Sequence, residues 1–587
     1  MKHRVKAVIL TAIAVLGFGG NAGATDYTRN TAGKWSSTTD WSPSGSYPDS
    51  TNDTVSITYG SALNLVLDVD ATVKSFTMTQ SGWNLGYFLG TNTLILNNGA
   101  SEALLRLRGN SYNGFLASTT NPPIRLDSNT LLDCQVSDQW ALGPNNNFLG
   151  AGTLRIWFYG GNRQTLRMSG KSTHTGGTTI ERGDVRIMGN GTLGANTISI
   201  NPATGYEANL LLDSVTNTVS GQAIIVNSTA NGMGGLGVAF TPASLAGLNV
   251  TGINGGVYGI NYDGAGGVAS MADLDTAFGA NTAGGYHWFL GSQSGKNKAD
   301  GNYGHPNPGT SWASGFSYTG SSLAPASDNI WRLGGGSSVA NITDGQQAGN
   351  ISKLTLSAAD CLSGSGSVII GSTNTYNSCG YIKFSAPQSY TGSTTINSGS
   401  YLEFNYAATN TYVGMISGAG ALFKGGTGKL SLLGTNTYSG ATTISGGGML
   451  EIGGKLLGNG AITINDIQSG LAITQGGEVR STSLSLNSNE SKVTVTDSGS
   501  IWTNNGALTM GKISSSIIVT NQGKAWSAGA TIGKHCGRPQ QHRYRHVRRF
   551  GLESKRGCPD DRRRGRHRQR AECLEQRHRD QCRRADH

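Results

Sequence analysis

The sequence predicts an all-β protein built as a β-solenoid with irregular insertions. Short runs alternate apolar with polar residues along most of the chain, and Gly, Asn and Ser separate nearly all of these runs. Alternation with a period of two gives a strand one inward and one outward face, and the separating residues favour turns. Similar segments also recur at a spacing of ~20–25 residues, which suits stacked coils because no single coil can bury its own apolar face.

The chain begins with a pattern that is typical of a secretory signal peptide. Lys2, Arg4 and Lys6 are basic, an apolar run covers 7–18, and 22–24 supplies small residues for cleavage. The apolar run falls short of the ~20 residues that span a bilayer. We therefore expect export with cleavage near Ala24, before Thr25, and no transmembrane segment in the mature chain.

Strands are predicted from residue 25 to residue 533. Clear examples lie at 55–58, 94–96, 154–157, 198–200, 354–356, 430–432 and 493–495. Each alternates apolar residues with Thr, Ser or another polar residue, as a half-buried strand does. The stretch 269–278 is the one that favours a short helix.

Three segments share the pattern Thr/Ser-Gly-x-Thr-Thr-Ile, at 175–180, 391–396 and 439–444. Each is preceded by a strand that starts Gly-x-Gly and is followed by a glycine and another alternating strand. The paired threonines suit strands and can stack as ladders between coils. A second repeat places Trp502 and Trp526 24 residues apart. If coils of this length filled the body, there would be roughly 21 of them.

The unit Thr-Gly-x-Thr-Thr-Ile-x-x-Gly, with 436–438 reading Asn-Thr-Tyr before its third copy, resembles the autotransporter-associated β-strand repeat, or passenger-associated transport repeat. Segments 35–41 and 318–336 are similar to other parts of bacterial autotransporter passengers. The resemblance implies a right-handed parallel β-helix, export to the cell surface, and no catalytic residue. Such passengers usually end in an outer-membrane anchor, and no matching strand pattern follows Gly533.

The composition divides the chain into five segments. We expect a signal peptide at 1–24, a β-solenoid with the first repeat at 25–237, a Gly-rich irregular insertion or loop-rich β region at 238–350, a β-solenoid with the other repeats at 351–533, and an Arg-rich tail at 534–587.

The net charge of +11 comes almost entirely from the tail. Residues 535–587 hold 17 Lys and Arg against 7 Asp and Glu, which leaves 28 against 27 elsewhere. The neutral body gives no reason to expect nucleic-acid binding. Back-translation one base later permits Gly-Ser-Val-Trp-Asn over 549–553, which matches the Trp repeat. We therefore favour a frameshift between Gly533 and Gln540, and a disordered tail without a site, over a basic arm for nucleic acid or lipid.

Few residues suggest chemistry. The segment 232–237 fits G-x-G-x-x-G, but it lacks the strand-to-helix setting of a nucleotide site, so we interpret it as a chance match. Asp273 and Asp275 could hold Ca²⁺, but a helix start is the favoured role because a calcium loop's spacing is missing.

A carboxylate cluster for glycan chemistry could form from Asp127, Asp133 and Asp138, as β-helix lyases and hydrolases place such groups on an outer face. No Arg or His motif accompanies them, so catalysis is not the favoured role. Four tryptophans could stack on sugars: Trp35, Trp41, Trp502 and Trp526. The last two recur at a repeat position, which favours packing against the next coil.

The body holds three cysteines, Cys134, Cys361 and Cys379, too few for a disulfide framework. Cys361 and Cys379 form either a disulfide or a pair of free buried thiols.

These observations predict no catalytic, cofactor-binding or metal-binding residue. We expect an exported, non-enzymatic protein of the cell surface or extracellular space, structural or adhesive, with glycans or other surface material as partners. The alternative is a β-helix enzyme that degrades polysaccharides. Carboxylates clustered with a basic partner on one face would favour the enzyme, and ladders of Thr, Asn and Ser would favour the structural role.

Overall fold

The computed structural model describes residues 24–59, 64–80, 87–109, 121–136, 139–142, 147–158, 165–229, 232–280, 286–292, 316–334, 337–338, 353–372, 378–510 and 512–532. This part is a β-solenoid of about 17 turns, fewer than uninterrupted coils would give. The predicted all-β solenoid is therefore confirmed, while its right-handed sense stays a prediction. The signal peptide and residues 533–587, with the expected frameshift, lie outside the described residues.

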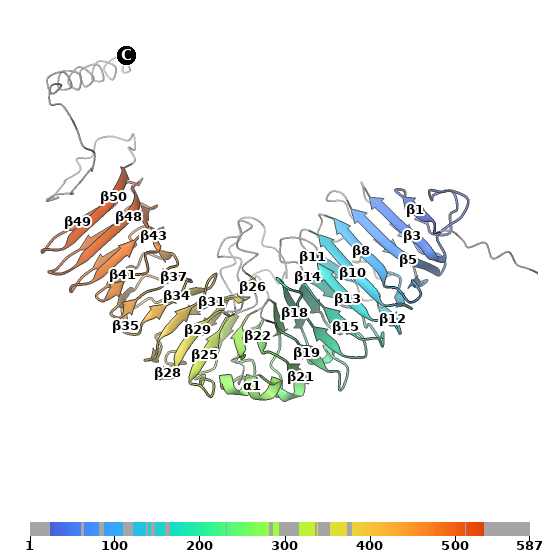
Figure 1. Cartoon of the computed structure of the whole chain (residues 1–587), viewed down its shortest axis with the longest axis horizontal. Helices are drawn as coiled ribbons and strands as arrows, with labels where there is room; N and C mark the ends of the chain where they lie inside the picture. The colour runs from blue at the N-terminus through green and yellow to red at the C-terminus, as the bar shows by residue number, and fades with distance from the viewer. Residues whose placement is uncertain are drawn as a thin grey trace, which may run out of the picture. The chain divides into compact units, whose positions relative to one another are not determined.

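Two long sheets begin in the first half of the chain, and the second of them continues to residue 417 (Figure 1). The first contains β1 (Asp26–Arg29), β3 (Ser50–Tyr59), β5 (Ala71–Gln80), β7 (Leu94–Leu96), β8 (Ala103–Gly109), β9 (Ile124–Leu126), β10 (Thr130–Val136), β12 (Phe148–Gly150), β13 (Leu154–Phe158), β15 (Thr178–Ile180), β17 (Ile198–Ile200), β19 (Ile224–Val226) and β21 (Val250–Gly252). The second contains β11 (Gln139–Leu142), β14 (Thr165–Met168), β16 (Gly183–Ile187), β18 (Glu207–Leu212), β20 (Met233–Val238), β22 (Gly256–Ile260), β23 (Trp288–Gly291), β25 (Ile330–Leu333), β29 (Ser367–Ile370), β33 (Thr394–Ile396) and β36 (Ile416–Ser417).

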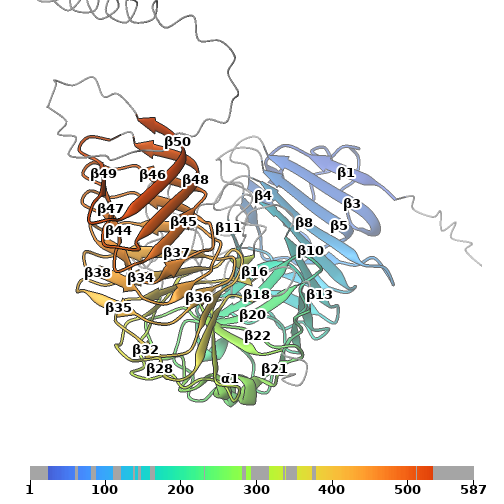
Figure 2. The ribbon, with the colours of Figure 1, turned by 60° about the vertical axis from the view of Figure 1, so that its left-hand side comes forward.

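Two further sheets continue through the second half, and Figure 2 shows β44, β47 and β49 along one side with β45 and β48 along another. One contains β24 (Phe316–Tyr318), β27 (Lys353–Leu356), β31 (Tyr381–Phe384), β34 (Tyr401–Asn405), β37 (Ala421–Gly425), β39 (Thr435–Asn436), β40 (Thr442–Ile444), β42 (Lys455–Leu456), β43 (Ala461–Ile464), β45 (Glu478–Ser481), β46 (Ser483–Leu486), β48 (Ile501–Met510) and β50 (Lys524–Ile532). The other contains β35 (Asn410–Tyr412), β38 (Lys429–Leu432), β41 (Met449–Ile452), β44 (Gly470–Ile473), β47 (Lys492–Val495) and β49 (Ser516–Val519).

Short strands complete the coils. A three-stranded sheet joins β2 (Gly33–Lys34), β4 (Asn64–Val66) and β6 (Tyr87–Leu89), and pairs join β28 (Ser363–Gly364) with β32 (Ser389–Tyr390) and β26 (Ser337–Ser338) with β30 (Ser378–Cys379). The long sheets pair in parallel, whereas β26 and β30 are antiparallel. The long strands β5 and β48 each pair with two strands of a neighbouring coil. Parallel pairing lets each coil supply the backbone hydrogen bonds of the next.

The core follows from the alternation in the sequence. In β13, Leu154, Ile156 and Phe158 are buried while Arg155 and Trp157 face outward. Full burial of such an apolar side chain stabilises the fold by roughly 1.5–3 kcal/mol. Buried residues of the same kind lie in register on neighbouring strands, so a single apolar core runs through the coils.

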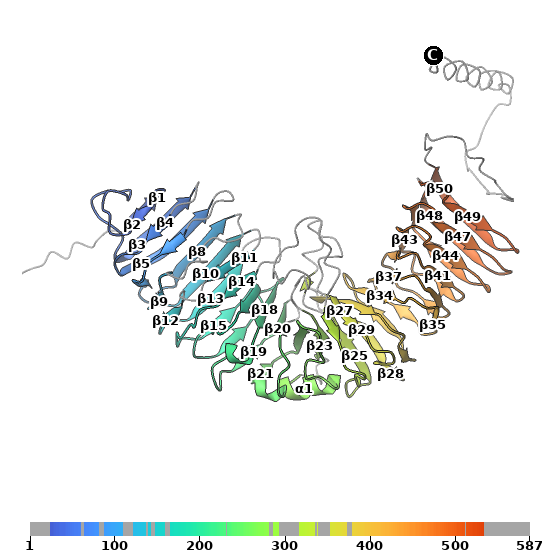
Figure 3. The ribbon, with the colours of Figure 1, turned by 180° about the vertical axis from the view of Figure 1, so that it is seen from behind.

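The region 238–350 contributes strands to the same sheets, since β22, β23 and β25 lie in the second sheet. The helix α1 (Met271–Phe278) confirms the predicted helical stretch, and it lies beside β21 in Figures 1 and 3. It buries Met271, Leu274 and Phe278. Two short 3-10 turns, η1 (Val215–Asn217) and η2 (Ala246–Leu248), complete the described helical residues.

Candidate functional site

Each of the three sequence repeats contains a buried hydrogen bond between an aromatic ring and a threonine four residues later. The bonds join His174 Nε2 to Thr178 at 2.8 Å, Tyr390 to Thr394 at 2.6 Å, and Tyr438 to Thr442 at 2.8 Å. The first threonine of each pair therefore points inward, and the second faces outward. A threonine ladder forms only where Thr443 lies opposite Thr463 among the described repeat strands.

The glycine of each repeat fills a place with no room for a side chain. A Cβ on Gly440 would lie 2.1 Å from the carbonyl oxygen of Gly420, and Gly392 stands in the same relation to Gly366, at 2.2 Å. Gly176 likewise lies against Gly152. The glycine of the repeat pattern is thus explained by the close contact between the backbones of successive coils.

These buried rings stay neutral at physiological pH. Burial lowers the pKa of His174 from 6.5 to about 4, although contacts with the backbone of Phe148 and Gly177 oppose the shift. Burial raises the pKa of Tyr438 well above its usual value. Neutral, fully enclosed groups fit a role in packing.

The two N-terminal tryptophans form a cap on the first coils. Trp35 is fully buried and Trp41 is 3 % exposed, so neither presents a face to a sugar. Trp35 donates from Nε1 to the carbonyl of Pro48 at 2.9 Å, and Trp41 donates from Nε1 to the carbonyl of Trp35 at 2.8 Å. Their rings meet edge to face, and the ring of Trp35 also stacks on Phe76.

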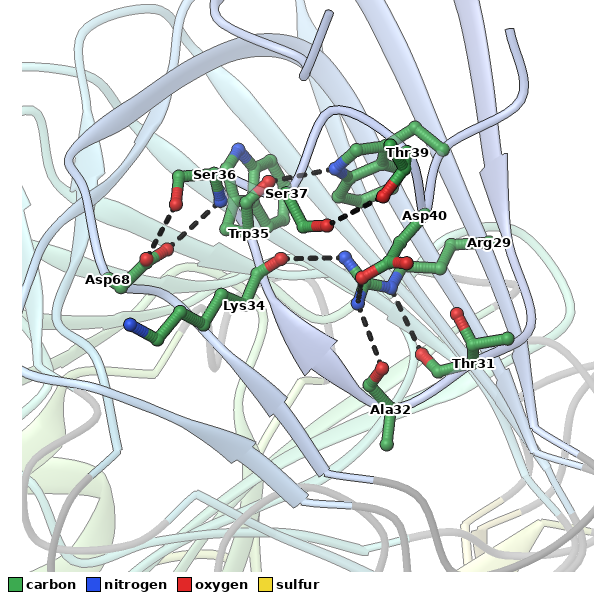
Figure 4. Close-up of polar contacts among 11 residues, drawn as sticks. Arg29, Thr31, Ala32, Lys34, Trp35, Ser36, Ser37, Thr39, Asp40 and Asp68 are labelled. Atoms are coloured by element: carbon green, nitrogen blue, oxygen red, sulfur yellow. Dashed lines mark hydrogen bonds and ion pairs between the residues drawn. The ribbon is translucent and has the colours of Figure 1, made fainter. Parts of the chain in front are cut away.

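Arg29 completes this cap, as Figure 4 shows. Its guanidinium donates to the carbonyls of Thr31, Ala32 and Lys34 and forms an ion pair with Asp40 at 3.0 Å. It also lies 5.2 Å from the centre of the Trp41 ring. A cation paired in this way fastens the loop to the coil rather than offering a free charge.

The carboxylates considered for glycan chemistry do not gather into one described site. Asp127 pairs with Arg125 at 2.7 Å, and Asp133 pairs across strands with Arg106 at 2.6 Å. Asp138 lies outside the described residues. Each described member thus already has an arginine partner.

A second set of charges does gather on the outward side of the first sheet. Arg155 donates to both oxygens of Glu102, at 2.8 and 2.6 Å, and to Glu181 at 2.9 Å. Nearby, Arg182 lies 3.8 Å above the ring of Tyr206. This is an ionic ladder that links coils, and a single guanidinium group is shared by its two carboxylates.

The glycine motif at 232–237 lies along β20, between β18 and β22. The motif therefore lies on a strand with a neighbour on each side. A nucleotide site needs it in a loop that leads into a helix, so the match is a chance one, as expected.

The two aspartates near the helix have different roles. Asp273 forms a capping box with Ser270, as expected for a helix start. Asp275 instead accepts hydrogen bonds from His287 Nδ1 at 2.7 Å and from the backbone N–H of Trp288 at 3.0 Å.

On its other side, His287 Nε2 lies 3.8 Å from Asp328, which pairs with Arg332. Sequence reasoning missed this network because its members come from α1, the residue before β23, and β25 with the turn before it. Arg332 lowers the pKa of Asp328.

Two further charged groups were also missed. Glu403 is only 7 % exposed on the outward face of β34, and Lys353 lies 3.0 Å from it. Lys424 is fully buried within the core and donates to the carbonyls of Gly425 and Gly426. Burial lowers its pKa to about 8. The alternation could have found it, because Lys424 shares a strand face with Leu422.

The two tryptophans of the second repeat differ in exposure. Trp502 is fully buried, with its Nε1 at 3.2 Å from Ser481 Oγ, as packing requires. Trp526 is 47 % exposed, and the coil that would follow it lies outside the described residues, so its packing against the next coil stays a prediction. The register pairs Trp502 with Ala525 and Thr503 with Trp526, and an offset of one residue sends the side chain to the opposite face.

Cys134 and Cys361 are free and buried, and the side chain of Cys379 lies outside the described residues. Within the described ranges, no group of three or more His, Cys, Asp or Glu side chains is placed to hold a metal ion. The same part of the chain contains no helix with the length and hydropathy to cross a membrane.

Comparison with protein families gives one match. The model of the passenger-associated-transport-repeat matches residues 149–187, 382–400 and 422–451. The three segments are passenger-associated transport repeats. Each matched segment contains one of the three aromatic–threonine hydrogen bonds, so the repeat in the sequence corresponds to a repeated structural unit. Neither a curated protein nor a solved structure matches the chain.

Proposed function

We propose that this chain is an exported, non-catalytic β-solenoid with a structural or adhesive role at the cell surface. The observation that carries the proposal is the presence of three passenger-associated transport repeats within one continuous solenoid. A repeat of this kind suits a passenger, whose coils project loops and polar faces into the surroundings. Glycans or other surface material are the partners that such faces would meet.

The charge distribution supports this function over a catalytic one. The described candidates Asp127 and Asp133 pair with arginines, and Glu102 and Glu181 share Arg155. A glycosidase needs one carboxyl group free to give a proton and another free to attack or activate water. Carboxylates held by guanidinium groups are not free in this way, and the ion pairs of Asp133, Glu102 and Glu181 join different coils.

One observation favours the alternative of a polysaccharide-degrading enzyme. Asp275 orients His287, and a second carboxylate, Asp328, lies beyond the ring at 3.8 Å. A carboxylate–histidine pair next to another carboxylate is an arrangement that can transfer protons.

The test compares cells that display the chain with cells that lack its gene. We expect antibodies against the body to label intact cells, N-terminal sequencing to begin at Thr25, and attachment to glycan-coated surfaces to fall when the gene is deleted. Purified protein should release no reducing or unsaturated sugars from a polysaccharide panel. Sugar release that Asp275→Asn or Asp133→Asn abolishes would establish the enzyme instead.

A further inference from the structure

An amine, a carboxamide and a carboxylate meet on the outward face of the second repeat. Glu403 Oε1 accepts a hydrogen bond from Asn405 Nδ2 at 2.6 Å and lies 3.8 Å from Lys383 Nζ. Glu403 Oε2 accepts from Lys353 Nζ at 3.0 Å and from the hydroxyl of Tyr381 at 2.8 Å. One buried carboxylate oxygen is thus shared by a lysine amine and an asparagine amide.

The strands fix this arrangement. Lys383 on β31 lies opposite Glu403 on β34, and Asn405 lies two residues further along β34 on the same face. In this parallel pair, one strand spacing and two residues along the strand separate the two Cα atoms by about 8 Å, within reach of a long side chain. A Cβ on Gly425 would lie 2.8 Å from Asn405 Nδ2 and 2.9 Å from Glu403 Oε1, so glycine leaves room for the pair.

The charges at this place do not balance. Among the described residues, two ammonium groups face Glu403, and the side chains of Lys353 and Lys383 are only 14 % and 22 % exposed. Poorly hydrated excess charge is costly. Burial alone would raise the pKa of Glu403, but Lys353, Asn405, Lys383 and Tyr381 outweigh burial and lower it. Glu403 is therefore ionised at neutral pH, and its unprotonated oxygens can relay a proton. The lowered pKa makes it a weak base, so the excess charge of the two ammonium groups is what favours loss of a proton from one of them.

We propose that Lys383 and Asn405 form an amide cross-link between β31 and β34. Glu403 takes a proton from the Lys383 ammonium, and the freed Nζ attacks Cγ of Asn405. The Nζ–Cγ bond forms and the Cγ–Nδ2 bond breaks. Two of the three Nζ protons pass through Glu403 to Nδ2, which leaves as ammonium, so the reaction needs no oxidant and removes the excess positive charge. Glu403 ends ionised, as a carboxylate that relays protons should.

The test is a tryptic digest of the full chain followed by mass spectrometry. Between Lys353 and Lys424 the only cleavage site is Lys383. We expect one uncut peptide, 354–424, lighter than its sequence by one ammonia, with fragments that join Lys383 to Asn405. Two separate peptides of unmodified mass, 354–383 and 384–424, would overturn the proposal. A link from Lys353 to Asn405 would also overturn the proposal, which assigns the reacting amine to Lys383.

Three variants separate chemistry from folding. Lys383→Arg keeps the charge but has no nucleophilic amine at neutral pH, and Asn405→Ser removes the carboxamide, so both should give no linked peptide. Lys353→Met removes the other lysine and should leave the link in place. Circular dichroism must show the strand spectrum of the parent for each variant. Loss of the link in a folded Lys353→Met, or its persistence in Lys383→Arg, contradicts the assignment.

Discussion

Replacing His174 by tyrosine should remove an acid sensitivity that only the first repeat has. His174 occupies the place that Tyr390 and Tyr438 take in the other repeats, and each ring bonds to the first threonine of its pair. The histidine is fully buried, and its Nδ1 has no hydrogen-bond partner among the described residues. A proton added there would be a buried charge, and the contacts with the backbone of Phe148 and Gly177 offset its cost only in part.

The magnitude follows from the pKa of His174, which burial lowers from 6.5 to about 4. Below pH 6.5 the unfolded chain takes up a proton that the folded chain does not accept until about pH 4. The free energy of unfolding is therefore intact above pH 6.5 and falls as the pH drops towards 4. A difference of this size is worth about 3 kcal/mol, or about a hundredfold in local opening.

Hydrogen exchange measures this locally, which suits a solenoid because its coils need not unfold together. Amides of β13 and β15 should lose protection at pH 4.5 relative to pH 7 in the parent, after correction for intrinsic exchange, and should lose much less in His174→Tyr. Amides of β33 and β40, beside the tyrosines, are the internal control. The explanation is refuted if protection in β15 falls equally in both proteins, or falls no more than in β40.

Three further outcomes are expected. Lys424 has a pKa of about 8 in the folded chain against 10.5 in the unfolded chain, so the free energy of unfolding should rise by about 3 kcal/mol between pH 8 and 10.5. Urea titrations of Lys424→Met should show no such rise, and equal pH profiles for the two proteins would contradict the prediction. Gly440→Ala should destabilise the fold by several kcal/mol because its Cβ meets a carbonyl oxygen at 2.1 Å. Gly529→Ala, whose Cβ has no atom within 4 Å, should leave the thermal melt unchanged, and similar losses of stability in the two variants would contradict the prediction. Trp41→Ala should cost about 3–5 kcal/mol and expose the first coils to protease, and an unchanged digestion pattern would argue against a capping role.

The strands and repeats could be predicted because their signal is local. A period of two and a glycine at a fixed position are visible in one sequence, and both reflect contacts that every coil repeats. The aromatic–threonine bond was also accessible, since His174, Tyr390 and Tyr438 each precede a threonine by four residues.

Other features depend on register and distant contacts. Trp526 repeats the spacing of Trp502, yet a one-residue offset between β48 and β50 turns it outward. The pairing of Asp275 with His287 joins a helix to a strand start across an insertion, and no periodic pattern marks it. The alternation of apolar and polar residues within a strand does not determine which strands pair or in which register.

The glycine contacts between coils restrict which insertions and deletions the chain can accept during evolution. Gly420, Gly440 and Gly460 follow one another at intervals of 20 residues, and each lies against the carbonyl of the one before it. Within this stretch, removal or duplication of 20 residues, or of a multiple of 20, would bring a glycine against a glycine again, whereas most other numbers would place a side chain against a backbone. Lineages of this protein should therefore gain and lose whole coils, with the joins falling in the same turn each time.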